Sequence, residues 1–314
     1  DHRDAASLLS LGAAAENLTL EAQRRDLGVA LAEFPAPNDP DVVAEFRFFA
    51  PGAQRSLESR AFVGLAAEIG RRHTNRRLGK PDALSSDVLG GLEAVVRAST
   101  CAQLTWFAQR SDVTRLGEIA ARAERLRMLH ARGHRDFTRE LKLTPEQARR
   151  DRDGIDPETL DLTPAERAGL VLLRNPAVAG HLRAWNAGRA LERLTRKSFA
   201  HASAVGVLSV SDFERRTCFR AGRVVERLWL TAEARGLALQ PHTAAVFLLA
   251  RFVDRDTAAF DGRDADELRE LNHEFRRLTG IEDRAVFLFR LFPGCPAPAR
   301  SLRRELGHVL VKVE

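Results

Sequence analysis

A cluster of cations stands where a phosphate-binding segment could lie. The stretch Arg71-Arg72-His73-Thr74-Asn75-Arg76-Arg77 puts four guanidinium groups beside a hydroxyl and an amide. Guanidinium forks bind phosphate oxygens bidentately, and a hydroxyl adds a further hydrogen bond. The cluster therefore suits a phosphate or the anionic edge of a heterocycle. A solvated run of charges has the same composition, so residue types alone leave both interpretations open.

A second basic group follows the prolines Pro296 and Pro298 and consists of Arg300, Arg303 and Arg304. It is separated from the first group by more than 200 residues. A fold that brings the two groups together would let them hold one phosphate from both sides. If the fold keeps them apart, both groups face water.

The remaining candidates for chemistry are weaker. His130 and His134 have the spacing of metal ligands on a helix, but Gly133 lies between them and no third ligand is evident, so we predict no metal site. Cys218 lies among arginines that could lower the pKa of a thiol, yet no histidine base is near in sequence, which favours a buried, inert thiol. The three cysteines form no disulfide or metal-binding pattern, which fits a reducing cytoplasm.

The composition is that of an ordinary globular protein, with 44% hydrophobic and 29% charged residues among 314. It excludes intrinsic disorder. No apolar run approaches the roughly 20 residues that span a bilayer, and the first residues lack the pattern of a signal peptide. We therefore expect a cytoplasmic chain that begins inside a longer protein. Of the 49 Lys and Arg only four are Lys, a bias that GC-rich coding explains better than selection for a polyanion.

Strands and helices alternate along the chain without a regular period, which predicts an α+β fold. We expect helices over residues 4–25, 57–71, 84–97, 112–128, 177–194 and 213–235, and strands over 42–49, 101–107, 204–210 and 285–291. A further helix begins at Thr163 as N-cap, with Pro164 in its first turn. Residues 110–152 carry 12 cations and 7 anions; the interleaved acids favour a solvated helical face over a nucleic-acid surface.

One internal similarity indicates a duplication. The segment Gly12–Ala22 shares Gly, Glu, two Leu and Ala with Gly222–Ala232 at the same offsets. Two unrelated amphipathic helices of similar composition would look alike, so that alternative stays open. A duplicated domain would pack these helices as pseudo-symmetric equivalents.

The motifs resemble the FMN-dependent nitroreductase family. Arg72-His73-Thr74-Asn75-Arg76 is similar to that family's Arg-x-Ser/Thr-x-Arg/Lys signature, and Gly222–Ala232 followed by Arg235–Pro241 resembles its long core helix and the turn after it. Ser301–Leu306 is similar to its C-terminal basic segment. The resemblance implies an α+β nitroreductase-like fold, a mixed or antiparallel sheet flanked by helices, with residues 1–55 as the remnant of a first half and 56–314 as a domain with an Arg-rich helical insertion near 110–155. It points to the long, two-half branch, as in modules fused to a ThiF-type adenylating domain.

The resemblance also implies a cofactor and a site. Arg72, His73, Thr74 and Arg76 would bind FMN, Arg303 and Arg304 would close on its phosphate, and Pro241, His242 and Thr243 would present backbone to the reactive edge of the flavin. The implied function is an FMN-dependent NAD(P)H oxidoreductase that reduces a small-molecule acceptor as a dimer or pseudo-dimer. No side chain is assigned a catalytic role, because hydride transfer belongs to the flavin. One alternative is a degenerate flavin-binding or docking module without turnover. Another is a nucleic-acid binder.

Overall fold

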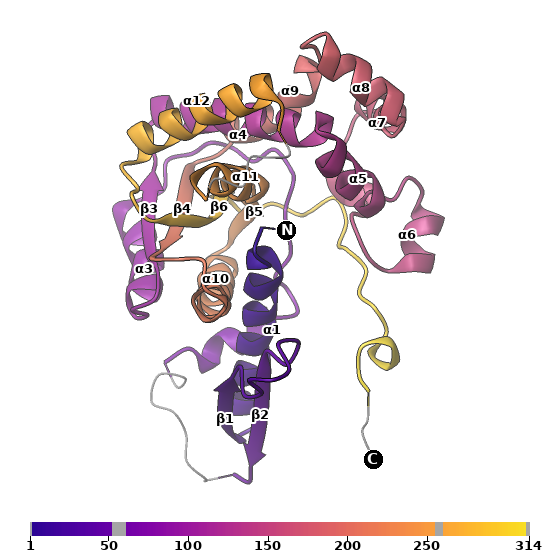
Figure 1. Cartoon of the computed structure of the whole chain (residues 1–314). Helices are drawn as coiled ribbons and strands as arrows, with labels where there is room; N and C mark the ends of the chain where they lie inside the picture. Colours follow the sequence, from indigo (N-terminus) through magenta and orange to yellow (C-terminus); the bar gives the residue numbers. More distant parts are fainter. Residues whose placement is uncertain (1, 52–60, 255–259, 312–314) are drawn as a thin grey trace.

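Helices cover both faces of a small antiparallel sheet in the computed structural model, which describes residues 2–51, 61–254 and 260–311 (Figure 1). The strand order is β3-β4-β6-β5, and every neighbouring pair is antiparallel. The strands are β3 (Gln103–Phe107), β4 (Ala204–Val210), β5 (Leu237–Pro241) and β6 (Arg284–Pro293). The fold is therefore α+β with an antiparallel sheet flanked by helices, as the sequence predicts.

The central strand β4 is buried along its whole length, because apolar helices pack on both of its faces. Val205 and Val207 point into a core formed with α4 (Arg110–Leu129), α11 (Ala244–Val253) and α12 (Gly262–Thr279). Leu208 and Val210 point into the opposite core, formed with α1 (Ala5–Arg24), α3 (Ser86–Arg97) and α10 (Arg215–Ala234). The alternation of side chains across a strand explains why this run is apolar at nearly every position.

Helices α1 and α10 cross in close contact at two glycines. A Cβ atom on Gly12 would lie 1.9 Å from the carbonyl oxygen of Phe219, and one on Gly222 would lie 2.1 Å from that of Leu9. Only glycine permits this approach of the two backbones. The two segments that share a sequence pattern thus pack against each other, as a duplication predicts.

After α1 the chain forms a separate hairpin of β1 (Gly28–Glu33) and β2 (Ala44–Phe49), which pair antiparallel with Gly28 opposite Phe49. Between β2 and α3 lies the 3-10 helix η1 (Val63–Glu68). Within the helix expected over 57–71, the structure forms only this short 3-10 helix, with turns at 61–62 and 69–71, so the long helix is wrong; its first positions, 57–60, lie outside the described residues. Strand β1, strand β5 and helices α11 and α12 were not predicted.

A second helical layer lies to one side of the sheet (Figure 1). It contains α5 (Ala131–Glu140), α6 (Pro145–Asp151), the 3-10 helix η2 (Pro157–Leu160), α7 (Pro164–Leu173) and α8 (Pro176–Ala184). Leu129, Phe137, Leu170 and Leu173 form its own small core. The Arg-rich segment thus departs from the sheet only after Leu129, because α4 is part of the main core.

Two helix predictions in this region can be compared directly with the structure. Helix α7 begins as expected, with a capping box between Thr163 and Glu166 and Pro164 in the first turn. The continuous helix predicted over 177–194 is wrong, because Asn186 and Gly188 adopt positive φ angles of 51° and 83°. The chain instead forms α8, the short 3-10 helix η3 (Arg189–Leu191) and α9 (Glu192–Ala200). The last described element is η4 (Leu306–His308), in an exposed C-terminal tail.

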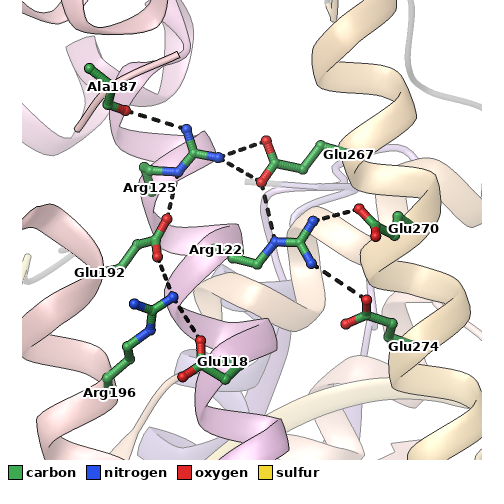
Figure 2. A network of polar contacts seen from close by, with 9 residues as sticks. All are labelled: Glu118, Arg122, Arg125, Ala187, Glu192, Arg196, Glu267, Glu270 and Glu274. Atoms are coloured by element: carbon green, nitrogen blue, oxygen red, sulfur yellow. Dashed lines mark hydrogen bonds and ion pairs between the residues drawn. The ribbon is translucent and has the colours of Figure 1, made fainter. Parts of the chain in front are cut away.

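Ion pairs join α4, α9 and α12. Arg125 lies between Glu192 and Glu267, with N–O distances of 2.8 and 2.6 Å, and Arg122 contacts Glu267, Glu270 and Glu274 (Figure 2). Arg122 and Arg125 are therefore used within the fold.

Candidate functional site

A cleft of about 340 Å³ lies between the segment 69–74 and the C-terminal tail. Its lining residues are Ile69, Gly70, Arg72, His73, Thr74, Arg300, Ser301 and Arg303. Three guanidinium groups, two hydroxyls and an imidazole thus face one space, and none of the lining side chains is a carboxylate. Such a set of donors is suited to a phosphate or another anion.

Arg72 is held at the inner wall of the cleft by α10. Its Nε lies 2.9 Å from Oε1 of the buried Glu226, and its guanidinium stacks over the ring of Trp229 at 4.6 Å. Burial raises the pKa of Glu226, and Arg72 opposes this shift. The carboxylate orients Arg72 and also competes with any anion for it.

The other wall is formed by the C-terminal tail, which polar contacts fasten to the body. Arg300 donates to the carbonyl oxygens of Gly70 and Arg71 at 2.9 and 3.4 Å. Arg152 pairs with Glu305 at 3.2 Å, and Arg304 pairs with Asp153 at 2.8 Å. Residues at the end of α6 thus hold the tail so that Arg303 lines the cleft.

His73, one of the residues that line the cleft, has an unsatisfied polar atom. Nε2 of His73 is buried and has no hydrogen-bond partner, whereas its Nδ1 lies 2.7 Å from the carbonyl oxygen of Arg71. A buried polar atom without a partner carries a free-energy cost that a ligand can remove. The residues present therefore fit a phosphate-bearing ligand such as FMN.

Asn75 and Arg290 hold this segment against the sheet. Asn75 is buried; its backbone N–H donates to Leu239 and its Nδ2 to the carbonyl oxygen of Cys295, at 3.2 and 2.6 Å. Arg290 is fully buried and donates to the carbonyl oxygen of Arg77 at 2.6 Å. It also donates to Gln240 Oε1 at 2.7 Å and to the carbonyl oxygen of Ser198 at 3.1 Å.

Arg76 points away from the cleft, toward the interior. Its Nη1 donates to Oγ1 of Thr159 at 3.2 Å, and burial lowers the pKa of this guanidinium. It lies close enough to His242 to act on its ring electrostatically: burial, Arg290 and Arg76 together lower the pKa of His242 to about 3. The ring of His242 is therefore neutral near pH 7, with Nε2 3.2 Å from Ser198 Oγ.

Pro241, His242 and Thr243 lie at the end of β5 and the start of α11, apart from the cleft. The backbone N–H of His242 donates to the carbonyl oxygen of Leu288 at 2.7 Å, so it is used within the sheet. Thr243 lines a different cavity of about 500 Å³, and its buried Oγ1 has no partner.

The structure thus gathers Arg72, His73, Thr74 and Arg303 around one cleft and places Arg76 beside His242. It does not bring Arg304 there, since that side chain pairs with Asp153. Arg300 of the second basic group also lines the cleft, and so does Ser301, which the sequence pattern did not single out. Glu226 is the glutamate shared by the two similar segments, but its pairing with Arg72 was not predicted, because the two residues are far apart in sequence.

The weaker candidates have structural explanations. Cys218 is fully buried, and burial raises its thiol pKa to about 11, so it is the inert thiol expected. Nε2 of His134 lies 2.7 Å from the carbonyl oxygen of Leu173, and His130 stacks on Phe260. Within residues 2–51, 61–254 and 260–311, no group of three or more His, Cys, Asp or Glu side chains suits a metal ion. Nor does any helix of these segments have the length and apolarity to cross a bilayer.

No family model matches the chain. Over 244 residues it is 32% identical to an uncharacterized protein, MT1398, of Mycobacterium tuberculosis (strain CDC 1551 / Oshkosh); the match covers 76% of this chain and 33% of the relative. The chain therefore spans about a third of the length of this relative.

Among solved structures, the chain is similar to the FMN-dependent nitroreductase NfnB from Mycobacterium smegmatis in complex with NADPH. The TM-score is 0.42 and the identity 15%, over 80% of this chain and 99% of the other. It is also similar to a nitroreductase with bound FMN from Desulfitobacterium hafniense DCB-2, with TM-score 0.41 and 11% identity over 80% and 98%. A nitroreductase-like family protein from Bacillus cereus gives 0.39 and 13% over 79% and 95%.

Proposed function

We propose that the cleft between residues 69–74 and 300–303 binds the phosphate end of FMN, and that the chain is a nitroreductase-like flavoprotein. The observation that carries the proposal is the convergence of Arg72, Arg300 and Arg303, from segments far apart in sequence, on a cleft without an acidic lining residue. Thr74 and Ser301 supply hydroxyls at the same place. The resemblance of Arg72–Arg76 and Ser301–Leu306 to the nitroreductase motifs names FMN as the phosphate compound.

In this proposal the chain binds and orients the cofactor. Arg72, oriented by Glu226, and Arg303, carried by the tail, neutralise the phosphate, while Arg76 lies inward beside the neutral His242. FMN, when bound, supplies hydride transfer from NAD(P)H to an organic acceptor. A dimer or pseudo-dimer, and a fused or neighbouring ThiF-type domain, remain part of the proposal.

The test is a titration of the purified protein with FMN and with riboflavin, which lacks the phosphate. Arg303→Ala removes a charged hydrogen bond and should weaken FMN binding about 10- to 100-fold while leaving riboflavin unchanged. Arg149→Ala is the matched control: this exposed arginine pairs with Glu146 within α6 and does not line the cleft, so FMN affinity should stay within about threefold. Equal losses in both variants, or no saturable FMN binding, would overturn the proposal.

A specific observation supports a second candidate, a flavin-holding module without turnover. The backbone N–H of His242, which the family resemblance directs toward the flavin edge, is donated to Leu288 instead. Flavin-dependent NAD(P)H oxidation by the reconstituted protein would exclude this candidate. Tight FMN binding with no such oxidation would establish it.

A further inference from the structure

The duplication extends beyond the crossing of α1 and α10. Gly12 contacts Phe219, and Gly222 contacts Leu9. Each residue of α1 corresponds to the residue 210 positions later in α10. The two contacts are therefore equivalent, with the roles of the helices exchanged. Both helices end alike: Asp26 and Gly236, again 210 apart, adopt φ angles of 66° and 68°. The helix-to-strand turn is therefore the same in both copies.

The strands that follow are also equivalent. Phe46-Arg47-Phe48-Phe49 in β2 matches Phe289-Arg290-Leu291-Phe292 in β6. Arg47 lies opposite Ala30, and Arg290 lies opposite Gln240, which is the residue 210 beyond Ala30. The hairpin β1-β2 is thus a second copy of β5-β6, in the same register. It lacks α11 and α12, which stand between β5 and β6.

The two copies differ in what covers the far edge of the second strand. In β6 that edge pairs with β4, with Phe289 opposite Gly206 and Leu291 opposite Ala204. In the part of the chain that the structure describes, β2 pairs with β1 alone. Within the described residues, no strand pairs with the outer edge of β5 or of β1, so β2 alone lacks a strand that its counterpart has.

The free edge of β2 presents the same backbone groups that β6 offers to β4. Phe34 donates to the carbonyl oxygen of Val43, which therefore faces β1, and main-chain groups alternate sides along an antiparallel strand. The N–H and C=O groups of Ala44, Phe46 and Phe48 therefore point away from β1, toward the free edge. In β6 the equivalent groups of Leu291 point toward β4, since the Leu291 carbonyl oxygen accepts from Ser203.

The side chains of β2 are also less buried than their counterparts in β6. Phe48 and Phe49 are 48% and 42% exposed, whereas their counterparts Leu291 and Phe292 are fully buried. An exposed edge with large apolar side chains is a site of strand addition. Its natural occupant should resemble β4, the strand that occupies the equivalent edge.

We infer that the free edge of β2 is a docking edge for an apolar strand of β4's chemistry, paired antiparallel and supplied by polypeptide outside residues 1–314. The M. tuberculosis relative has room for such a strand, because this chain covers only 33% of it. The occupant completes a second half-sheet, which makes the whole a pseudo-symmetric pair of halves around the α1–α10 crossing.

The test adds a peptide with the sequence of residues 204–210, flanked by lysines for solubility, to the 314-residue protein. Hydrogen exchange of the Phe46 and Phe48 amides should slow at least about tenfold at saturation. A control peptide with Gly206→Pro lacks the N–H at the position opposite Phe289, the counterpart of Phe46, and should leave exchange unchanged. On the protein side, Phe46→Leu should bind the peptide and Phe46→Pro should not.

Two results would overturn the inference. One is unchanged exchange at millimolar peptide. The other is protection of β2 without peptide that rises with protein concentration, together with a dimer in light scattering, because a second copy would then occupy the edge. The peptide controls keep the test decisive even if Phe46→Pro disturbs the hairpin.

Discussion

The guanidinium of Arg72 and the carboxylate of Glu226 form an ion pair of 2.9 Å at the inner wall of the candidate cleft. The pair joins the motif segment to the core helix α10, so the fold places a buried anion next to a proposed anion site. Its consequence for binding can be measured.

Replacing Glu226 by glutamine should strengthen anion binding. Glu226→Gln removes the charge that competes for Arg72, and we expect FMN affinity to rise about tenfold, equivalent to roughly 1.4 kcal/mol. Glu16→Gln is the matched control, since Glu16 is equally buried but pairs with Arg223 and Arg227. Calorimetric titration of both variants checks this; weaker binding by Glu226→Gln would contradict it.

The glycines at the helix crossing should not tolerate a methyl group. Gly222→Ala would set a Cβ 2.1 Å from a backbone oxygen and should cost about 2–4 kcal/mol of unfolding free energy, more than the helix propensity that alanine gains. Gly90→Ala, in α3 with open space around it, should instead stabilise by about 0.5–1 kcal/mol. Urea denaturation measures both; similar effects would show that the helices do not approach this closely.

The equivalent arginines Arg47 and Arg290 of the duplicated strands should contribute very differently to the stability of the protein. Arg290→Met removes three hydrogen bonds of a buried guanidinium, and we expect a loss of about 3 kcal/mol. Arg47→Met, at the exposed counterpart, should change stability by less than about 0.5 kcal/mol. Thermal and chemical denaturation would report the difference. A costly Arg47→Met would mean that β2 is already covered.

In the ion-pair network of Figure 2, the loss of stability on replacing an arginine should depend on how deeply its ion pair is buried. Arg125→Met leaves the buried Glu192 without its partner on α4 and should destabilise by about 3–4 kcal/mol. Arg122→Met, at a more exposed position, should cost about 1 kcal/mol and less at high salt. Denaturation at low and at 1 M salt separates the two; equal costs would contradict the role assigned to burial.

His242 should make the protein less stable in acid. Its folded-state pKa of about 3 lies below the ordinary value of 6.5, so the unfolded chain takes up a proton in that window and the folded protein does not. Stability from this residue therefore falls as pH falls from 6.5 toward 3, by at most about 1.4 kcal/mol per pH unit. His242→Gln should flatten this slope. An NMR titration of the His242 ring near pH 6.5 would refute it.

The sequence by itself determined the elements whose signal is local. Apolar runs predicted β4 and β6, and Thr163 with Pro164 predicted the start of α7, because strand burial and helix capping act over a few residues. The repeated glycine-helix pattern predicted the α1–α10 pair. The motif around Arg72 and the basic group after Pro298 were recognised from residue types and order.

Only the tertiary structure decided which cations meet. Arg303 lines the cleft and Arg304 does not, although the two are adjacent, because the contacts of the tail with Arg152 and Asp153 set which way each points. Arg76 turns inward to Thr159, and Glu226 of α10 pairs with Arg72. Such pairings depend on residues far apart in sequence, and local propensity holds no information about them. The unpaired edge of β2 is likewise apparent only from the tertiary structure, where the equivalent edge of β6 pairs with β4.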